Sequence, residues 1–170
     1  MKTPLKILFA AALLLVGTGV SAQNAKLGYT TDAQAVMSEL PEMAEANKNL
    51  QAFAEELSKQ GNALNTEFSN LYQDYNKKAA TYTDAIRTEK ENELNSMRER
   101  LEQFQEKAEQ DFNEKRAELM QPVFLKLRNA IEAVAKAGGY AYIFDATGVL
   151  YINPALATDV TAEIKKELGL

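Results

Sequence analysis

The sequence predicts an α+β protein that is mostly α, in which a long antiparallel helical hairpin projects from a small β-rich oligomerisation body. Residues 41–137 contain only one glycine, Gly61, and only one proline after Pro41. Apolar residues in this stretch recur at alternating steps of three and four, which is the spacing of a coiled-coil helix. Short runs rich in aromatic and β-branched residues lie on both sides of it. A coiled-coil arm on a small β body accounts for both features.

The first 22 residues have the pattern of an export signal. Lys2 and Lys6 give a basic start, and residues 7–16 form an apolar run without a charged side chain. Val20 and Ala22 stand at positions −3 and −1 of a cleavage site after Ala22. The apolar run is about half of the roughly twenty residues that a membrane-spanning helix needs. We therefore expect the chain to be exported and residues 1–22 to be removed after Ala22.

The composition argues against several classes of function. The full chain carries a net charge of −5, and loss of the two signal lysines takes the mature chain to −7. An acidic chain lacks the basic surface that is typical of nucleic-acid-binding proteins. The absence of histidine and cysteine removes the most common general base, the most common metal ligand and the thiol nucleophile. The sequence thus predicts no nucleic-acid partner, no cofactor and no metal site.

One acidic residue, Asp145, lies in a predicted turn beside a strand, where catalytic acids often occur. Aspartate is also a favoured turn residue, and no second polar group converges on it by spacing. The chain has no glycine-rich phosphate loop and no nucleophile motif. We therefore expect no catalytic residue and a protein that is not an enzyme.

The apolar pattern divides into two arms over residues 41–137, each presenting one seam of apolar side chains. A glycine inside a helix costs about 1 kcal/mol, so Gly61 is expected to be a flex point. Proline removes one backbone donor, so a kink is expected at Pro122. The first seam comprises Leu40, Met43, Leu50, Phe53, Leu57, Leu64, Phe68, Leu71, Tyr75, Ala79 and Tyr82, with Asn47 and Gly61 in its gaps. The second comprises Leu94, Met97, Leu101, Phe104, Ala108, Phe112, Arg116, Leu119, Val123, Leu127, Ile131 and Val134.

The chain is expected to reverse near residues 79–85, between the two seams. Thr81 and Asp84 have the spacing of a capping box, and Thr83 could cap the second arm equally well. The alternative is one continuous helix, since no strong helix breaker occurs here. At about 1.5 Å per residue, the two arms of a hairpin would be roughly 60 and 80 Å long.

Residues 23–40 and 138–170 are expected to form the body. A first strand is predicted over 25–30, followed by a short helix that Thr31 or Asp32 caps. Residues 140–144 and 149–152 predict two further strands, joined as a hairpin by a four-residue turn. A closing helix, capped by Thr158 or Thr161, is expected to end near Leu168.

This sheet is too small and too apolar on both faces to stand alone. It needs a cover, and a second copy of itself is the natural one, so we expect a homo-oligomer. The residues expected to form this oligomerisation body are Leu27, Tyr29, Tyr142, Ile143, Phe144, Leu150 and Ile152.

Aromatic side chains along the arms are candidates for binding a non-native polypeptide. Each one, taken singly, is explained as a wide seam residue. Together they would form a discontinuous apolar lining. They are Phe53, Phe68, Tyr72, Tyr75, Phe104 and Phe112.

The order of these elements resembles the Skp/OmpH-like family of periplasmic chaperones over essentially the whole mature chain. The flanking segments and the Gln–Pro kink are the more specific part, because many helices share a coiled-coil composition. The segments that carry the resemblance are KLGY at 26–29, TDAQAVMSELPE at 31–42, LMQPV at 119–123, AVAK at 133–136, GY at 139–140, IFD at 143–145 and VLY at 149–151.

The resemblance implies a jellyfish-shaped homotrimer whose helical arms enclose a cavity. It also implies an ATP-independent holdase that binds unfolded outer-membrane proteins and prevents their aggregation. Familiar members are basic, whereas this mature chain is acidic, which weakens any electrostatic grip on acidic clients, envelope lipid or lipopolysaccharide. Hydrophobic contact is the expected mechanism. The alternative function is a coiled-coil structural scaffold of the cell envelope, whose arms would pair with another helical protein.

Overall fold

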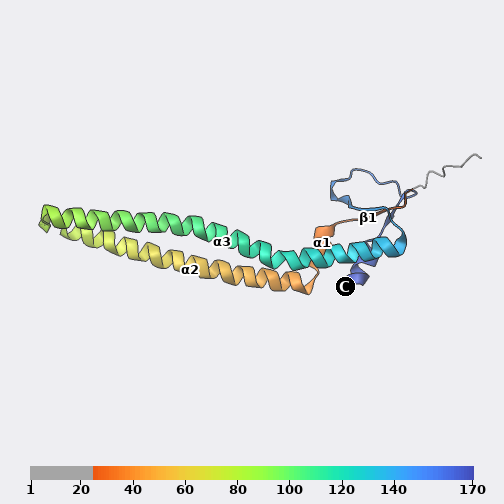
Figure 1. Cartoon of the computed structure of the whole chain (residues 1–170), viewed down its shortest axis with the longest axis horizontal. Helices are drawn as coiled ribbons and strands as arrows, with labels where there is room; N and C mark the ends of the chain where they lie inside the picture. The colour runs from red at the N-terminus through yellow and green to blue at the C-terminus, as the bar shows by residue number, and fades with distance from the viewer. Residues whose placement is uncertain (1–24) are drawn as a thin grey trace, which may run out of the picture.

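The computed structural model describes residues 25–170, which form a long two-helix arm with a small body at one end (Figure 1). The predicted fold class, a mostly helical α+β protein with a helical hairpin, is confirmed. The predicted export signal, residues 1–22, lies outside the described residues. The elements are β1 (Leu27–Thr30), α1 (Ala33–Ser38), α2 (Pro41–Lys78), the 3-10 turn η1 (Ala79–Thr81), α3 (Asp84–Gly138), β2 (Tyr142–Asp145), the 3-10 turn η2 (Ala146–Gly148), β3 (Ala157–Asp159) and α4 (Thr161–Leu168).

The arm consists of α2 and α3, which run side by side in opposite directions (Figure 1). Pro41 occupies the first turn of α2, where its missing N–H has no helical partner to lose. The helices have 38 and 55 residues, so they are about 57 and 82 Å long. Along the middle of the arm, seam residues such as Leu64 and Leu101 are half-buried or buried, whereas their neighbours are exposed. The predicted seams therefore carry the packing between the two helices.

The chain reverses at η1, inside the segment where the sequence predicts the tip. The Oγ1 of Thr83 accepts a hydrogen bond from the N–H of Ile86 at 3.4 Å and so caps α3. Thr81 instead donates its hydroxyl to the carbonyl of Lys78 at 2.7 Å. Of the two predicted caps, Thr83 is therefore right and the Thr81–Asp84 capping box is wrong.

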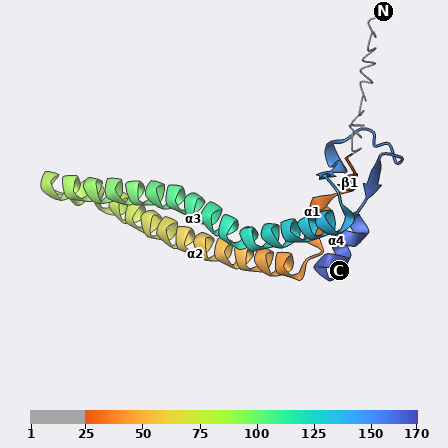
Figure 2. The same ribbon diagram turned by 45° about the vertical axis from the view of Figure 1, so that its right-hand side comes forward.

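α3 continues through Pro122 to its end at Gly138. Figure 2 shows α3 changing direction in its green-to-teal part, which lies between residues 100 and 125 on the colour bar. Proline deprives the carbonyl four residues earlier of its helical donor, here the carbonyl of Glu118. A proline inside a helix is an established cause of such a bend.

The sheet has the strand order β2-β1-β3, and both outer strands run parallel to β1. The predicted hairpin between residues 140–144 and 149–152 is therefore wrong. β2 is followed by η2, residues 149–152 form no strand, and the third strand is β3. The physical reason is that the chain after β2 leads to a partner on the far edge of β1 and does not fold back on the outer edge of β2, which stays unpaired. Leu27 pairs with Tyr142 on one edge and with Ala157 on the other, so the connecting chain must cross from one side of β1 to the other.

The two predicted body helices are present as α1 and α4. α4 ends at Leu168, as expected, and Gly169 follows it in the left-handed region with φ 80°. The predicted caps Thr158 and Thr161 are wrong. Thr161 is the first helical residue, and its N–H donates to the Asp159 carboxylate at 2.9 Å.

The hydrophobic core lies where the base of the hairpin meets α1 and α4. It includes the first turns of α2 and the last part of α3, so it crosses the predicted boundaries between arm and body. The sheet contributes Ile143 only at the edge of this core. The buried core residues are Val36, Met37, Leu40, Met43, Ala46, Val123, Leu127, Ala130, Val134, Val160, Ile164 and Leu168.

Candidate functional site

The six predicted aromatic residues are distributed along both helices of the arm and form no single lining. Among them only Tyr72 is exposed, with 50% of its surface accessible. The other five are half-buried, because they occupy the seam between the two helices. Their rings are therefore partly available to a bound polypeptide and partly used to hold the hairpin together.

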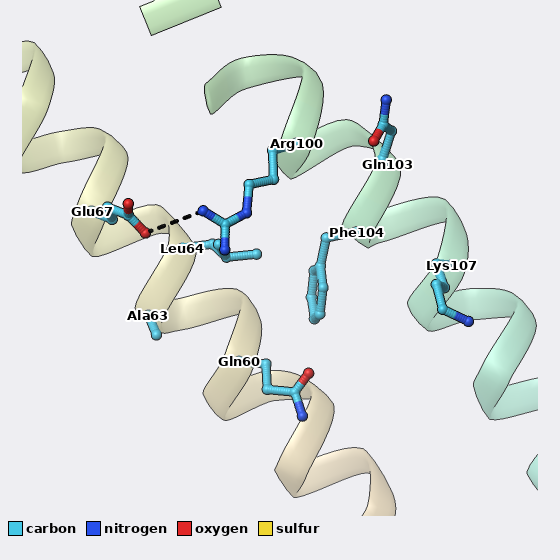
Figure 3. A pocket seen from close by; sticks show the side chains of 8 residues that line it. All are labelled: Gln60, Ala63, Leu64, Glu67, Arg100, Gln103, Phe104 and Lys107. Carbon is cyan, nitrogen blue, oxygen red and sulfur yellow. Dashed lines mark ion pairs between the residues drawn. The ribbon is translucent and has the colours of Figure 1, made fainter. Parts of the chain in front are cut away.

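Phe104 lies between two shallow grooves in the middle of the arm. The larger groove, about 520 Å³, is formed by the facing surfaces of α2 and α3 (Figure 3). Arg100 and Glu67 approach each other across it, with 3.8 Å between nitrogen and oxygen. The smaller groove, about 350 Å³, lies on the Gly61 side of the ring. The larger groove is lined by Gln60, Ala63, Leu64, Glu67, Arg100, Gln103, Phe104 and Lys107.

Gly61 provides space for the Phe104 ring. A Cβ atom at Gly61 would lie 3.1 Å from Cε1 of Phe104. α2 nevertheless runs through this position without interruption. The glycine thus has a packing role that the heptad pattern alone did not indicate, because the pattern does not show which residue faces a gap in the seam.

Gly61→Ala is expected to stiffen the arm. Alanine favours a helix over glycine by about 1 kcal/mol, and the half-exposed Phe104 ring, with a groove on each side, has room to shift by a few tenths of an ångström. We expect slower amide hydrogen exchange around residues 57–65 and a small gain in stability in urea. Gly61→Ala with Phe104→Leu is the matched variant, because the smaller side chain removes the close contact. Unchanged exchange in both variants would show that Gly61 is not a flex point.

Aromatic residues also gather near the arm tip. Phe68 and Tyr72 stack with ring centroids 6.2 Å apart, and Tyr75 and Tyr82 approach to 6.1 Å. The Tyr75 hydroxyl donates to the Glu91 carboxylate at 2.7 Å, from α2 to α3. This hydrogen bond stabilises the neutral phenol, so it raises the pKa of Tyr75. The tip is therefore held closed by both packing and a hydrogen bond.

The body exposes an apolar surface between β2 and β3. Leu150 is fully accessible and Tyr151 is 77% exposed. No charged residue occurs from Ala146 to Thr158. Of the predicted body residues, Tyr142 and Leu150 are exposed, whereas Leu27, Tyr29, Ile143, Phe144 and Ile152 are half-buried. Sequence reasoning missed the other exposed apolar residues here, which are Val149, Tyr151 and Leu156.

Three large apolar residues on α3 are exposed and were also missed. Ile86 lies in the first turn after the tip, whereas Phe124 and Leu125 lie near the base of the hairpin. The sequence does indicate that Phe124 and Leu125 lie outside the seam. Val123, Phe124 and Leu125 are consecutive, and at 100° per residue they cannot all face the same core.

The Asp145 carboxylate accepts hydrogen bonds that hold the body together. One oxygen accepts from the N–H of Ala33 at 3.1 Å, and the other accepts from the N–H of Thr147 at 2.8 Å and from its hydroxyl. These hydrogen bonds stabilise the charged form, and the bond with the Thr147 side chain contributes most to the lowered pKa of Asp145. The carboxylate therefore links β2 to the start of α1, where Asp32 also caps the helix.

Within residues 25–170, no three His, Cys, Asp or Glu side chains are grouped closely enough to hold a metal ion. No helix in this part of the chain combines the length and the apolar character needed to cross a membrane.

Comparison with known proteins gives consistent similarities. The pattern of the family described as "Outer membrane protein (OmpH-like)" matches residues 26–168. "Chaperone protein Skp" of Yersinia enterocolitica is 29% identical over 168 residues, which cover 96% of this chain and 98% of that protein. The protein of the same description from Pectobacterium atrosepticum is 27% identical with the same coverage. A crystal structure of an OmpH-like outer membrane chaperone from Caulobacter crescentus has the same fold, with a TM-score of 0.69, 14% identity and 85% coverage of each chain.

Proposed function

Because this chain belongs to the OmpH-like family of outer membrane proteins, we propose that it acts in the periplasm as an ATP-independent holdase chaperone. It binds unfolded outer-membrane proteins between its helical arms and prevents their aggregation. The observation that carries this proposal is the extent of the family match, which spans both the arm and the body. The two relatives described as Skp chaperones also align over nearly their full length.

The shape of the arm suits the capture of a disordered chain. A hairpin only two helices thick buries one seam and leaves most of each helix accessible to a client. The groove beside Phe104 and the exposed Tyr72 ring offer separate apolar contacts along this surface. Many weak apolar contacts allow a client to be held without being fixed in one conformation, and its release needs no nucleotide.

Self-association would turn separate arms into a cavity. β2 and β3 each have an outer edge that is unpaired in the single chain, and such edges tend to pair with another chain. The uncharged segment around Leu150 and Tyr151 exposes apolar side chains, and such a surface is typical of a contact with another protein chain. A homotrimer, with bodies together and arms projecting, fits both features.

Electrostatic attraction has a minor part in this proposal. The mature chain has a net charge of −7, so its overall charge opposes binding to the phosphate groups of lipopolysaccharide or anionic lipid. Contact with the envelope would therefore be weaker than apolar contact with clients.

The holdase activity is tested by diluting a urea-unfolded outer-membrane β-barrel protein into buffer with the purified mature chain. We expect suppressed light scattering at a near-stoichiometric ratio and without ATP, because the arms shield the apolar segments of the client. Unaltered aggregation would reject the holdase and favour an envelope scaffold.

A further inference from the structure

An apolar patch at the base of the hairpin is separate from both the seam and the body surface. Phe124 and Leu125 on α3 are 53% and 47% exposed. Met120, one turn before Phe124, is half-buried at the edge of the core. Residues four apart share one face of a helix, so Met120 and Phe124 form a continuous apolar strip, with Leu125 beside it. We call Met120, Phe124, Leu125 and Arg128 the basal patch.

The basal patch lies in a part of the chain without acidic residues. From Leu119 to Ile131 there is no aspartate or glutamate, although the arm is acidic on both sides, beginning with Glu118 and Glu132. Two cations lie in this segment. Lys126 points toward α2, where it pairs with Glu42. Arg128 takes part in no ion pair within residues 25–170.

Arg128 lies on the same face as the two exposed apolar side chains. It follows Phe124 by four residues and Leu125 by three, which is the spacing of neighbours on a helix surface. The nearby acids Glu42, Glu45 and Glu118 line a different groove with Lys126, on the side of α3 that faces α2. Glu132, one turn after Arg128, pairs with Lys136, which contributes most to its lowered pKa, and Arg128 adds a smaller attraction. The basal patch is thus apolar with one positive charge that forms no ion pair in the described part of the chain.

We propose that the basal patch binds an apolar segment of an unfolded polypeptide that carries a carboxylate. Phe124 and Leu125 contact the apolar side chains, and the Arg128 guanidinium pairs with the carboxylate, which it can bind through two parallel hydrogen bonds. This inference rests on the proposed holdase function and deepens it. It names a site at the base of the arms, where sequence reasoning placed none, and it restores a local attraction for acidic clients.

A second copy of this chain fits the basal patch less well. The exposed apolar segment that the body offers, Ala146–Thr158, has no charged residue, so it has no partner for Arg128. That segment also adjoins unpaired strand edges, which are better partners for one another. Charge complementarity therefore favours an acidic client.

The test uses a pair of synthetic peptides with alternating apolar and polar residues and one tryptophan. They are identical except that one has glutamate where the other has lysine. The mature chain contains no tryptophan, so tryptophan fluorescence reports the peptide alone. We expect the wild type to bind the glutamate peptide about threefold more tightly than the lysine peptide, the size of a half-exposed ion pair. Arg128→Glu should reverse this preference, and Arg128→Lys should retain it in weaker form.

Phe124→Ser with Leu125→Ser should weaken binding of both peptides by about tenfold, as expected for loss of two partly buried apolar contacts. Ile86→Ser is the matched control, because it removes an exposed apolar residue of α3 far from the patch and should leave binding unchanged. Equal affinity for both peptides in wild type and Arg128→Glu would overturn the proposal. So would a smaller assembly mass in the double variant, since it would show that the patch is a contact between copies.

Failure of this proposal is distinguishable from failure of the holdase function. If the wild type suppresses aggregation of the outer-membrane protein and the double serine variant does so equally well, the basal patch is not the site and the holdase stands. If the wild type itself fails to suppress aggregation, the proposed function fails whatever the peptides show.

Discussion

Leu150→Asp combined with Tyr151→Asp is expected to convert the assembly into single chains and to abolish holdase activity. Leu150 is fully exposed and Tyr151 is 77% exposed in the single chain, so neither is part of its core. In a trimer each would be covered by a neighbouring body, and an apolar side chain of this size contributes about 1.5–3 kcal/mol when buried. A buried carboxylate without a partner costs several kcal/mol more. Separate arms enclose no cavity, so clients would aggregate.

Light scattering coupled to size-exclusion chromatography measures the mass, and circular dichroism checks that the helices remain. Ile86→Asp is the control, because it places the same charge on an exposed apolar residue of the arm and should change neither mass nor helicity. An unchanged mass for the double aspartate variant would show that Leu150 and Tyr151 lie outside the contacts between copies.

The two helices of the arm could be predicted from the sequence because helix formation depends on residues that are close together in the chain. Steps of three and four place the seam residues on one face of each helix, and the described structure buries or half-buries almost all of them. Pro41 and Thr83 mark the starts of the two helices through rules that involve only neighbouring residues. Arg116 is the exception in the second seam. It is exposed, as expected for a charged residue in a stretch where the seam is open to solvent.

The third strand was not predictable, because pairing of strands is not local. Val149 to Ile152 has the residue types of a strand, but nothing in its spacing shows that a later segment, and not this one, pairs in the sheet. The segment β3, of sequence ATD, has almost no strand character and is placed by its pairing with β1. The apolar residues around Leu150 are exposed in the single chain, which fits the proposed contact between copies.

The candidate binding residues were only partly predictable for a related reason. The sequence pattern around a seam aromatic is the same whether the ring packs against the opposite helix or contacts a client. In the structure Phe104 does both, since it fills the space above Gly61 and borders two grooves. Phe124 and Leu125 follow the seam residue Val123 directly, which indicates that the three cannot all face the seam, but only the packing of α3 against α1 and α2 shows which of them are exposed.

Gly138→Ala is expected to destabilise the chain by about 1–3 kcal/mol, as overpacking does, although alanine is the better helix former. A Cβ atom at Gly138 would overlap Cε2 of Tyr140 and would lie 2.6 Å from its Cδ2. The opposite edge of the same ring lies close to Gly28 of β1, where a Cβ would be 3.1 Å from Cδ1. The ring is thus held between two glycines and cannot move aside without disturbing the sheet.

The Tyr140 ring also joins the end of α3 to β1 through Lys26. The Lys26 ammonium lies 4.2 Å from the ring centroid and donates to the carbonyl of Gly138 at 2.8 Å, where a positive charge stabilises a helix C-terminus. Displacing the ring would loosen this contact together with the packing of β1, and with it the strand on which the body is built.

Urea unfolding followed by circular dichroism measures the loss of stability for Gly138→Ala. Gly148→Ala is the matched control, because no atom lies within 4 Å of its Cβ position and its φ is not positive; its stability should match the wild type. In the Tyr140→Ala background Gly138→Ala should become neutral or slightly stabilising, since the obstructing ring is gone and alanine favours the helix. A Gly138→Ala variant as stable as the wild type would show that the Tyr140 ring does not occupy this position in solution.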